Sequence, residues 1–145
     1  QEQRISYKER PERLRKLGRR WSFTIGKKSS RRCLLAQGPT ESSEDLLAGF
    51  KPHLIVTDLP YGIQHKGQLL SLLANALPIW MKLLPPQGTL VFSWDATRVD
   101  RQDMIDAAQS AVPALVRTDE PYNQLAHRVD RVIKRRDVLV LHHPP

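Results

Sequence analysis

The sequence predicts an α/β domain in three αβα layers, built on a mostly parallel sheet with an antiparallel edge strand. Strand-like and helix-like segments alternate between residues 53 and 118, which is typical of this class. The runs at 53–58 and 89–95 are almost continuously apolar, as in strands that are covered on both faces. The last two strand-like segments, 114–118 and 137–143, are candidates for an antiparallel pair at the edge.

The composition favours one globular domain outside the membrane and the secretory pathway. A chain of 145 residues can bury one core. No apolar run approaches the roughly 18–20 residues of a membrane span, and the N-terminus lacks the apolar region of a secretory signal. The single cysteine, Cys33, cannot form an internal disulfide, so we expect a cytoplasmic location. Because the first residue is Gln1 rather than Met, we expect a fragment or a processed product.

The net charge of +8 is concentrated at the N-terminus. Residues 1–32 hold twelve Lys and Arg against three Glu, whereas the remaining residues hold eleven basic against twelve acidic side chains. A basic block of this kind attracts phosphate backbones at long range. A solvated helical face explains the same charges equally well.

The N-terminal part is expected to form a segment of its own. Residues 1–20 are polar with a thin apolar stripe, which favours a helix, and residues 21–26 alternate as in a half-buried strand. A basic turn then leads to a second strand at 33–38. We therefore divide the chain into a basic helix and hairpin segment, 1–32, and a sheet domain, 33–145.

Two helices are predicted within the sheet domain. A strongly apolar helix should begin near Gly67 and end at Pro85, and Pro78 should kink or split it. Its Trp80 is expected in the core. Asp100 is the expected N-cap of the second helix. The segment 123–136 favours neither helix nor strand.

A carboxylate, a proline and an aromatic residue follow the first apolar strand of this domain. The strand ends in Asp58, and Leu59, Pro60 and Tyr61 come next. Ligands of open α/β sheets bind beyond the carboxyl ends of the strands. Pro60 holds Leu59 extended, which leaves the Leu59 carbonyl free to accept a hydrogen bond beside Asp58. An Asp-Pro-Gly turn without a function is the alternative interpretation.

Two neighbouring acceptors and an aromatic ring suit a planar heterocycle that carries an exocyclic NH2 group. The acceptors bind the two N–H bonds, and the ring stacks on Tyr61, which is worth about 1–3 kcal/mol per base. This arrangement favours electron density on the amine nitrogen, aimed at an electrophile such as a methyl group on a sulfonium. Holding the two centres in line supplies much of the acceleration.

These residues resemble a known family. The stretch "IVTDLPYG" resembles motif IV, usually Asp/Asn-Pro-Pro-Tyr, of class I S-adenosylmethionine-dependent methyltransferases that modify exocyclic amines. The trailing Gly62, the stretch "LPPQGTLVFSWD" and the C-terminal tail are similar to the THUMP-linked tRNA guanine-N2 methyltransferases. The resemblance covers about residues 33 to 143. It implies the C-terminal portion of a Rossmann-like methyltransferase sheet, with S-adenosylmethionine as cofactor and RNA as partner.

The resemblance also implies site residues. Asp58 and the Leu59 carbonyl would hold the target amine, Pro60 would shape the turn, and Tyr61 and Gly62 would face the base. Leu59 replaces the commoner first proline. The positions that would face the cofactor are Asp58 together with Gln37 and Gly38, where the family usually has an acidic residue; Glu41 and Glu44 are the substitutes.

One family feature is absent from the sequence. The family binds its cofactor through a glycine-rich turn, but no Gly-x-Gly occurs among the seven glycines. We therefore expect weak or no cofactor binding by these residues alone. The implied partner is a missing N-terminal half of the domain or a second subunit across the sheet edge.

Several further residues are candidates for the site. His65 follows the motif and either contacts the substrate or lies in solvent; His127 and Arg128 in the C-terminal tail either touch RNA phosphates or form a solvated face. Asp95 or Ser93 either lines the same crevice or caps a turn. No spacing of Cys and His suits a metal site.

Three functions are consistent with this pattern. The first is methyl transfer to a nucleobase amine in RNA, by likeness guanine N2 of tRNA. The second is the same reaction on adenine or cytosine amines of DNA or RNA. The third is a non-catalytic half-domain that binds RNA or a partner.

Overall fold

The computed structural model describes residues 20–24, 32–47, 50–61 and 65–145, and it divides into two compact units, 1–50 and 51–145. The division therefore falls after Phe50, not after residue 32 as the sequence suggested. The expected N-terminal helix and the basic turn lie outside the described residues.

The described part of the first unit is a hairpin and a short helical segment. Strands β1 (Arg20–Thr24) and β2 (Arg32–Ala36) pair antiparallel, with Arg20 opposite Ala36. The 3-10 helix η1 (Thr40–Ser42) and helix α2 (Ser43–Leu46) follow. Both expected strands are thus present, but they form a two-stranded sheet of their own.

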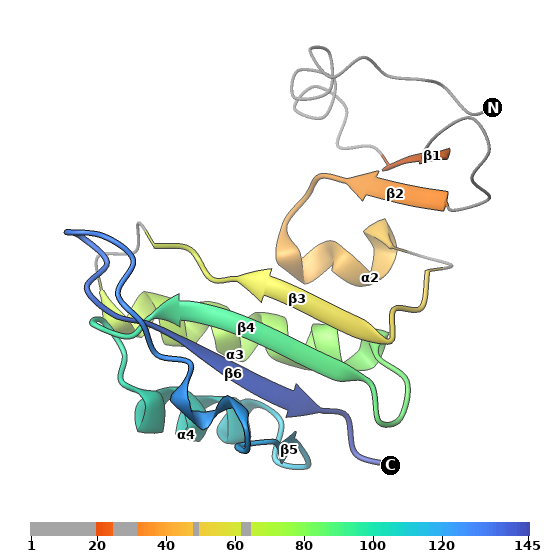
Figure 1. Ribbon diagram of the computed structural model, residues 1–145. Coiled ribbons are helices and arrows are strands. Elements are labelled where there is room, and N and C mark those ends of the chain that lie inside the picture. Colours follow the sequence, from red (N-terminus) through yellow and green to blue (C-terminus); the bar gives the residue numbers. More distant parts are fainter. Residues whose placement is uncertain (1–19, 25–31, 48–49, 62–64) are drawn as a thin grey trace. The chain divides into compact units, whose positions relative to one another are not determined.

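The second unit is built on a four-stranded sheet with the order β3-β4-β6-β5 (Figure 1). Its strands are β3 (Leu54–Asp58), β4 (Thr89–Asp95), β5 (Val116–Arg117) and β6 (Arg136–His142). The pair β3 and β4 is parallel, whereas β6 runs antiparallel to both β4 and β5. Three of the four strands therefore point the same way, which confirms the α/β class. The antiparallel pair of β5 and β6 is also confirmed, but the reversed strand is β6, which lies inside the sheet.

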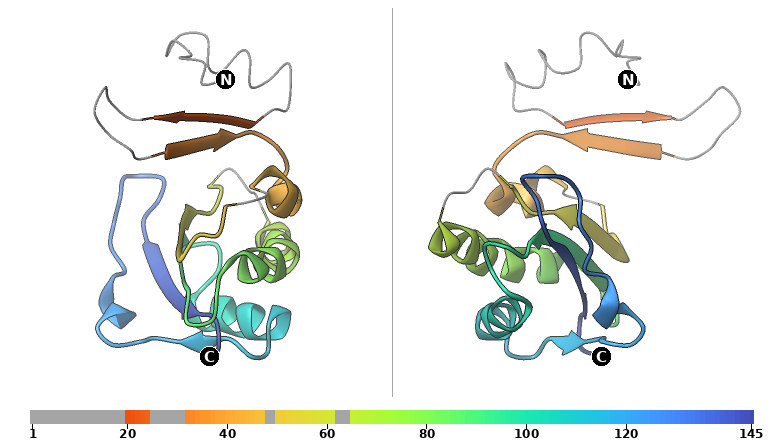
Figure 2. Two further views of the ribbon diagram at one scale, coloured as in Figure 1. Left: turned by 90° about the vertical axis from the view of Figure 1, so that its right-hand side faces the viewer. Right: turned by 60° about the vertical axis from the view of Figure 1, so that its left-hand side comes forward.

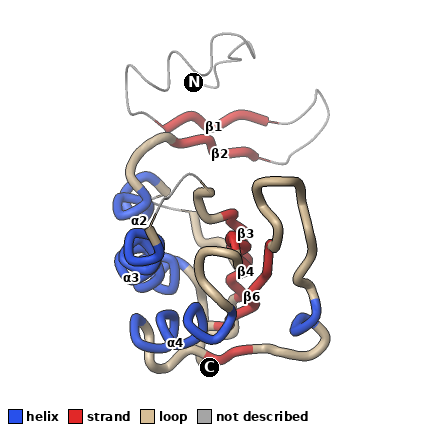
Figure 3. Tube along the Cα trace, turned by 90° about the vertical axis from the view of Figure 1, so that its left-hand side faces the viewer, coloured by secondary structure: helices blue, strands red, loops and turns tan. Residues whose placement is uncertain are grey.

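The helices of this unit lie on one face of the sheet. Helices α3 (Lys66–Leu83) and α4 (Arg101–Ala111) pack side by side there, as Figures 2 and 3 show. The opposite face carries the 3-10 helix η2 (Tyr122–Gln124) and the loops beside it. Among the described residues of 51–145, no α-helix forms the expected third layer on that face, where the segment between β5 and β6 contributes only η2 and loops.

The core lies between the sheet and the two helices. Leu90, Phe92 and Trp94 on alternate positions of β4 are completely buried, and the rings of Phe92 and Trp94 lie 5.8 Å apart. On β3, by contrast, Leu54 and Val56 are 55% and 69% exposed. The expectation that both strands are covered on both faces therefore fails for β3, a strand at the edge of this sheet.

Helix α3 runs through Pro78 without a break, so the expected split is wrong. A proline removes one backbone hydrogen bond from a helix interior. Burial of Leu77 and Trp80 on either side offsets that loss. The helix ends before a turn in which the Gly88 N–H donates to the Pro85 carbonyl at 2.8 Å. Gln87 in this turn has a left-handed φ of 63°.

Candidate functional site

The termini of three strands lie together at one end of the four-stranded sheet. The parallel strands β3 and β4 end there, and the antiparallel β6 begins there. In the register of the sheet, Asp58 lies beside Ser93, and Asp95 lies beside Arg136. Side chains from three distant parts of the sequence are thereby brought to the carboxyl end of the sheet, where α/β proteins bind ligands.

One oxygen of the Asp58 carboxylate accepts two hydrogen bonds, and the other oxygen is presented to Arg136. The hydroxyl groups of Tyr61 and Ser93 both donate to Oδ1. The other oxygen, Oδ2, lies 3.5 Å from Nη2 of Arg136. The Asp58 side chain is 49% exposed, so a ligand in solution can reach it. An ionised carboxylate has about four acceptor positions, so Oδ2 keeps capacity for an N–H donor.

Tyr61 adopts a different arrangement from the free stacking platform that the sequence suggested. Its hydroxyl group points at Asp58, and one face of its ring is covered by Arg136, whose Cζ lies 4.8 Å from the ring centroid. Burial, followed by the hydrogen bond to Asp58, raises the pKa of the Tyr61 phenol above its ordinary value. The phenol is therefore a hydrogen-bond donor at neutral pH.

Arg136 is the residue of this cluster whose position the sequence did not reveal. It was one basic residue among several in the tail, and only the register of β6 places it beside Asp58 and Tyr61. The ion pair and the cation–π contact of a partly exposed arginine are worth about 0–1 and about 0.5–1 kcal/mol. Its Nε is buried and finds no hydrogen-bond partner among the described residues.

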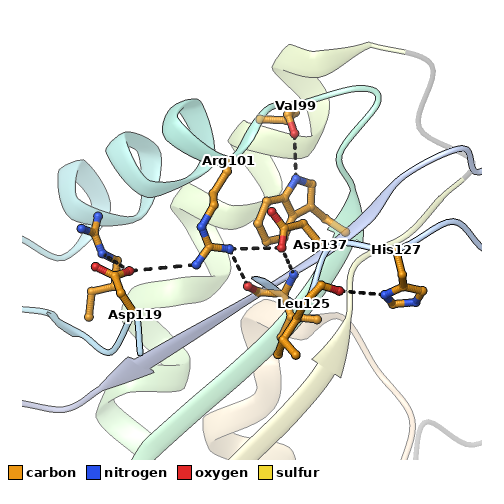
Figure 4. Close-up of polar contacts among 9 residues, drawn as sticks. Val99, Arg101, Asp119, Leu125, His127 and Asp137 are labelled. Carbon is orange, nitrogen blue, oxygen red and sulfur yellow. Dashed lines mark hydrogen bonds and ion pairs between the residues drawn. The ribbon is translucent and has the colours of Figure 1, made fainter. Parts of the chain in front are cut away.

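A second network fixes the start of β6 (Figure 4). Arg101, the first residue of α4, donates from Nη1 to the Asp137 carboxylate at 3.1 Å and to the Val138 carbonyl at 2.8 Å. Asp119 lies 4.0 Å from its Nη2. Because Asp137 is only 1% exposed, this pair is shielded from water. The network holds the backbone next to Arg136 in place.

The other motif residues lie around this cluster. Leu59 is buried and its N–H donates to the Ser93 carbonyl at 2.8 Å, while Pro60 is exposed. The role of the Leu59 carbonyl stays a prediction. Gly62 lies outside the described residues.

The candidate histidines and Arg128 are exposed. His65 is the residue before α3, and its side chain does not cap the helix. His127 exchanges two backbone hydrogen bonds with Arg136, at 2.8 and 2.9 Å, so it lies at the base of the hairpin that leads into β6. Arg128 lies next in this hairpin, which projects at the end of the sheet where β3 ends (Figure 1).

Gln37 and Gly38 belong to the first unit. A side chain at Gly38 would meet Cδ1 of Leu46 at 2.5 Å, so Leu46 occupies the space beside this glycine. The role of Gln37 and Gly38 toward a cofactor stays a prediction.

Asp95 caps a turn rather than joining the Asp58 cluster. Its Oδ1 accepts from the backbone N–H of Thr97 at 3.0 Å and from the Thr97 hydroxyl at 2.5 Å. Within the described ranges, no group of three or more Cys, His, Asp or Glu could hold a metal ion. The helices of the described residues include none that is long and apolar enough to cross a membrane.

Comparison with known proteins identifies similar structures. No model of a protein family and no curated protein matches the chain. A protein of Thermus thermophilus assigned as a DNA modification methylase matches 74% of the chain with 20% identity and a TM-score of 0.50. A second crystal structure of that protein gives 19% identity, 74% coverage and a TM-score of 0.46. The N-methyltransferase NodS of Bradyrhizobium japonicum, in complex with S-adenosyl-L-homocysteine, matches 64% with 20% identity and a TM-score of 0.44.

The chain spans about half the length of these proteins, covering 51%, 52% and 46% of them respectively. At this level of identity the likeness concerns the fold. The chain has the α/β, Rossmann-like fold of the Thermus methylase over about half of that protein's length.

Proposed function

We propose that the chain is the target-binding half of an S-adenosylmethionine-dependent methyltransferase that modifies an exocyclic amine of a nucleobase, guanine N2 of tRNA in particular. One observation carries the proposal. At the end of β3, one oxygen of the half-exposed Asp58 side chain already faces the nitrogen of a planar group that lies over the Tyr61 ring. The fold and the motif Asp58-Leu59-Pro60-Tyr61 are consistent with it.

The residues of the site act by binding and orienting the amine. Tyr61 and Ser93 fix Oδ1 of Asp58, so Oδ2 is held in one position. This oxygen and the Leu59 carbonyl accept the two N–H bonds, and the Tyr61 ring packs against the base. The lone pair of the amine nitrogen then points away from the two acceptors. Orientation of this kind lowers the barrier of transfer reactions by a large part.

When bound, the cofactor would supply a methyl group on a sulfonium; a C–N bond would form as the C–S bond breaks with its electron pair left on sulfur, and the proton lost by the amine would pass to water. The described residues fit the amine side of this reaction. Gln37 and Gly38 lie in the first unit, and their contact with the cofactor stays a prediction. We propose that a further domain half or a second subunit completes the cofactor site.

RNA is the proposed partner, in the cytoplasm. The hairpin that begins at His127 and Arg128 is exposed and basic, and it lies at the same end of the sheet as Asp58 (Figure 1). His65 is exposed next to the motif. Together with the basic block at 1–32, these residues are suited to phosphate contacts that position a substrate.

A DNA amine is the second candidate target. The assignment of the Thermus protein as a DNA modification methylase favours it. The same acceptor pair would bind the amine of adenine or cytosine. The third alternative, a non-catalytic RNA-binding half-domain, leaves the Asp58 cluster without a role.

The test is methyl transfer by the complete protein to tRNA, rRNA and DNA, measured with a labelled methyl group. We expect Asp58→Asn to lower transfer by roughly a hundredfold or more, as when one positioned polar group is lost from a site. Cofactor affinity, measured by calorimetry, should change little. Asp106→Asn is the matched control, because Asp106 is an exposed carboxylate on α4. Wild-type turnover in Asp58→Asn would show that the assignment of Asp58 is wrong.

A further inference from the structure

The guanidinium group of Arg136 makes the two contacts that the target base would make. Its Nη2 lies 3.5 Å from the presented oxygen of Asp58, where the amine is proposed to bind. Its Cζ lies 4.8 Å from the centroid of the Tyr61 ring, where the base is proposed to stack. A planar nitrogen group and a base cannot occupy this position at the same time.

The chemistry of the group matches one nucleobase more closely than the others. A guanidinium is a planar carbon that carries three nitrogens. The C2 atom of guanine also carries three nitrogens: N1, N3 and the exocyclic amine. The amine-bearing carbons of adenine and cytosine carry only two nitrogens each. A site shaped around a guanidinium therefore resembles a site for the amine edge of guanine.

The Arg136 side chain is held less firmly than its backbone. The backbone is fixed by two hydrogen bonds to His127 and by the pairing of β6 with β4. The side chain has a long ion pair to a half-exposed carboxylate, and its buried Nε lacks an acceptor among the described residues. Rotation of the side chain into water would satisfy Nε without moving the strand.

We infer that Arg136 is a placeholder: its guanidinium fills the amine subsite in the free protein, guanine displaces it, and the subsite prefers guanine over adenine and cytosine. This inference rests on the proposed function, since it takes the Asp58 cluster as the target site. It adds the residue that closes the subsite and a structural reason for the preference for guanine that the proposed function assumes.

The experiment is a titration of the complete protein with guanosine, adenosine and cytidine, which carry no phosphate. Binding is followed by the 19F signal of fluorotyrosine at position 61, assigned by its loss in Tyr61→Phe. We expect Arg136→Ala to bind guanosine about tenfold more tightly than the wild type, since the displaced ion pair and cation–π contact are weak. Adenosine and cytidine should bind more weakly than guanosine.

Two further variants separate a placeholder from a general effect of charge. Arg135→Ala removes an equal charge from the neighbouring exposed residue and should leave guanosine binding unchanged. Arg136→Lys keeps the charge without the planar group and should bind guanosine more tightly than the wild type. Millimolar methylguanidine should compete with guanosine in Arg136→Ala. Circular dichroism of each variant verifies that the fold is retained.

The outcomes distinguish this inference from the proposed function. Unchanged, weaker or undetectable guanosine binding by Arg136→Ala, or a preference for adenosine or cytidine, overturns the placeholder even where methyl transfer still depends on Asp58. Tight guanosine binding by Arg136→Ala without any methyl transfer by the complete protein overturns the proposed function and leaves the placeholder standing.

Discussion

At the scale of single residues, the site depends on how the two oxygens of one carboxylate differ. Two hydroxyl groups hold Oδ1 of Asp58, and one of them belongs to Tyr61, whose pKa is raised. A phenol that donates to a carboxylate keeps its proton to higher pH, because ionisation would place two negative charges side by side. The charge of Asp58 therefore opposes ionisation of the Tyr61 phenol.

This coupling predicts a change in the titration of Tyr61. The difference in ultraviolet absorbance between the wild type and Tyr61→Phe isolates this phenol from the other two tyrosines of the chain. We expect its pKa to fall in Asp58→Ala, because the hydrogen bond and the neighbouring charge are removed, while burial still holds it up.

The raised pKa of Tyr61 also determines how the stability of the protein changes with pH. A raised pKa in the folded state contributes stability that is present below the unfolded pKa of about 10 and is lost as the pH rises through the folded value. In Ser93→Ala, which removes the other hydroxyl group but no charge, we expect the pKa of Tyr61 to rise, because the hydrogen bond of Ser93 lowers it. An unchanged pKa of Tyr61 in Asp58→Ala would contradict the hydrogen bond to Asp58.

At the scale of elements, the Arg101 network connects the start of α4 to the start of β6. Asp137 is almost fully buried, and Arg101 supplies both its charge partner and a hydrogen bond to the next carbonyl. Removing one partner of a buried pair leaves the other charge uncompensated. Surface pairs, by contrast, contribute little.

We expect Asp137→Ala to lower the free energy of unfolding by about 3 kcal/mol, as for a broken buried ion pair. Asp119→Ala, in which a partly exposed carboxylate 4.0 Å from Arg101 is removed, should cost less than about 1 kcal/mol. Urea denaturation of the complete protein measures both values. Equal effects of the two substitutions would show that the buried pair does not fasten β6.

The turn between α3 and β4 offers a second prediction at this scale. Gln87 has a left-handed backbone, which is unfavourable for a residue with a side chain and free of that strain for glycine. We expect Gln87→Gly to raise the free energy of unfolding by up to about 1 kcal/mol. This is the gain from relieving the backbone strain, reduced by the larger conformational entropy that glycine loses on folding.

Gln87→Ala is the matched control for this turn, because alanine keeps the unfavourable backbone while losing the same side chain. It should not stabilise the protein. Thermal unfolding of the two variants under identical conditions measures the difference, and a lower midpoint for Gln87→Gly than for Gln87→Ala would contradict the assigned turn.

At the scale of the whole molecule, the sequence patterns predicted the order of the elements well and their neighbours less well. The runs at 53–58 and 89–95, the helix before Pro85 and the cap at Asp100 all correspond to observed elements. These features depend on local chemistry: apolar periodicity, capping and turn residues.

The missed features depend on pairing between distant segments. Helices cover only one face of the sheet in the described part of 51–145, and Leu54 and Val56 are exposed as a result. The position of Arg136 beside Asp58 follows from the register of β6 against β4, which no local pattern encodes. The sequence therefore placed Asp58 and Tyr61 together at a strand end, but it did not reveal the cation that faces them.

Under the proposed function, the uneven charge of the whole chain predicts how the binding of tRNA to the complete protein depends on salt. Each neutralised phosphate releases counterions. The logarithm of the binding constant therefore falls with the logarithm of the salt concentration, with a slope of about 0.7–0.9 per phosphate contact. Replacing Arg13, Arg15, Lys16 and Arg19 by Gln should weaken binding and make this slope shallower. Filter binding from low to high salt measures it. A slope equal to that of the wild type would mean that the basic block does not contact RNA, and the solvated face would be the better explanation.

The last strand of this sheet in chain order is an interior strand. β6 lies between β4 and β5, and β5 has no other neighbour in this sheet. In a chain growing on the ribosome, β5 therefore cannot join the sheet, and Arg136 cannot pair with Asp58, until residues Arg136–His142 have been made. Premature termination before this strand would remove the middle of the sheet rather than its margin, and the nascent protein would be left with two separate strand groups instead of one.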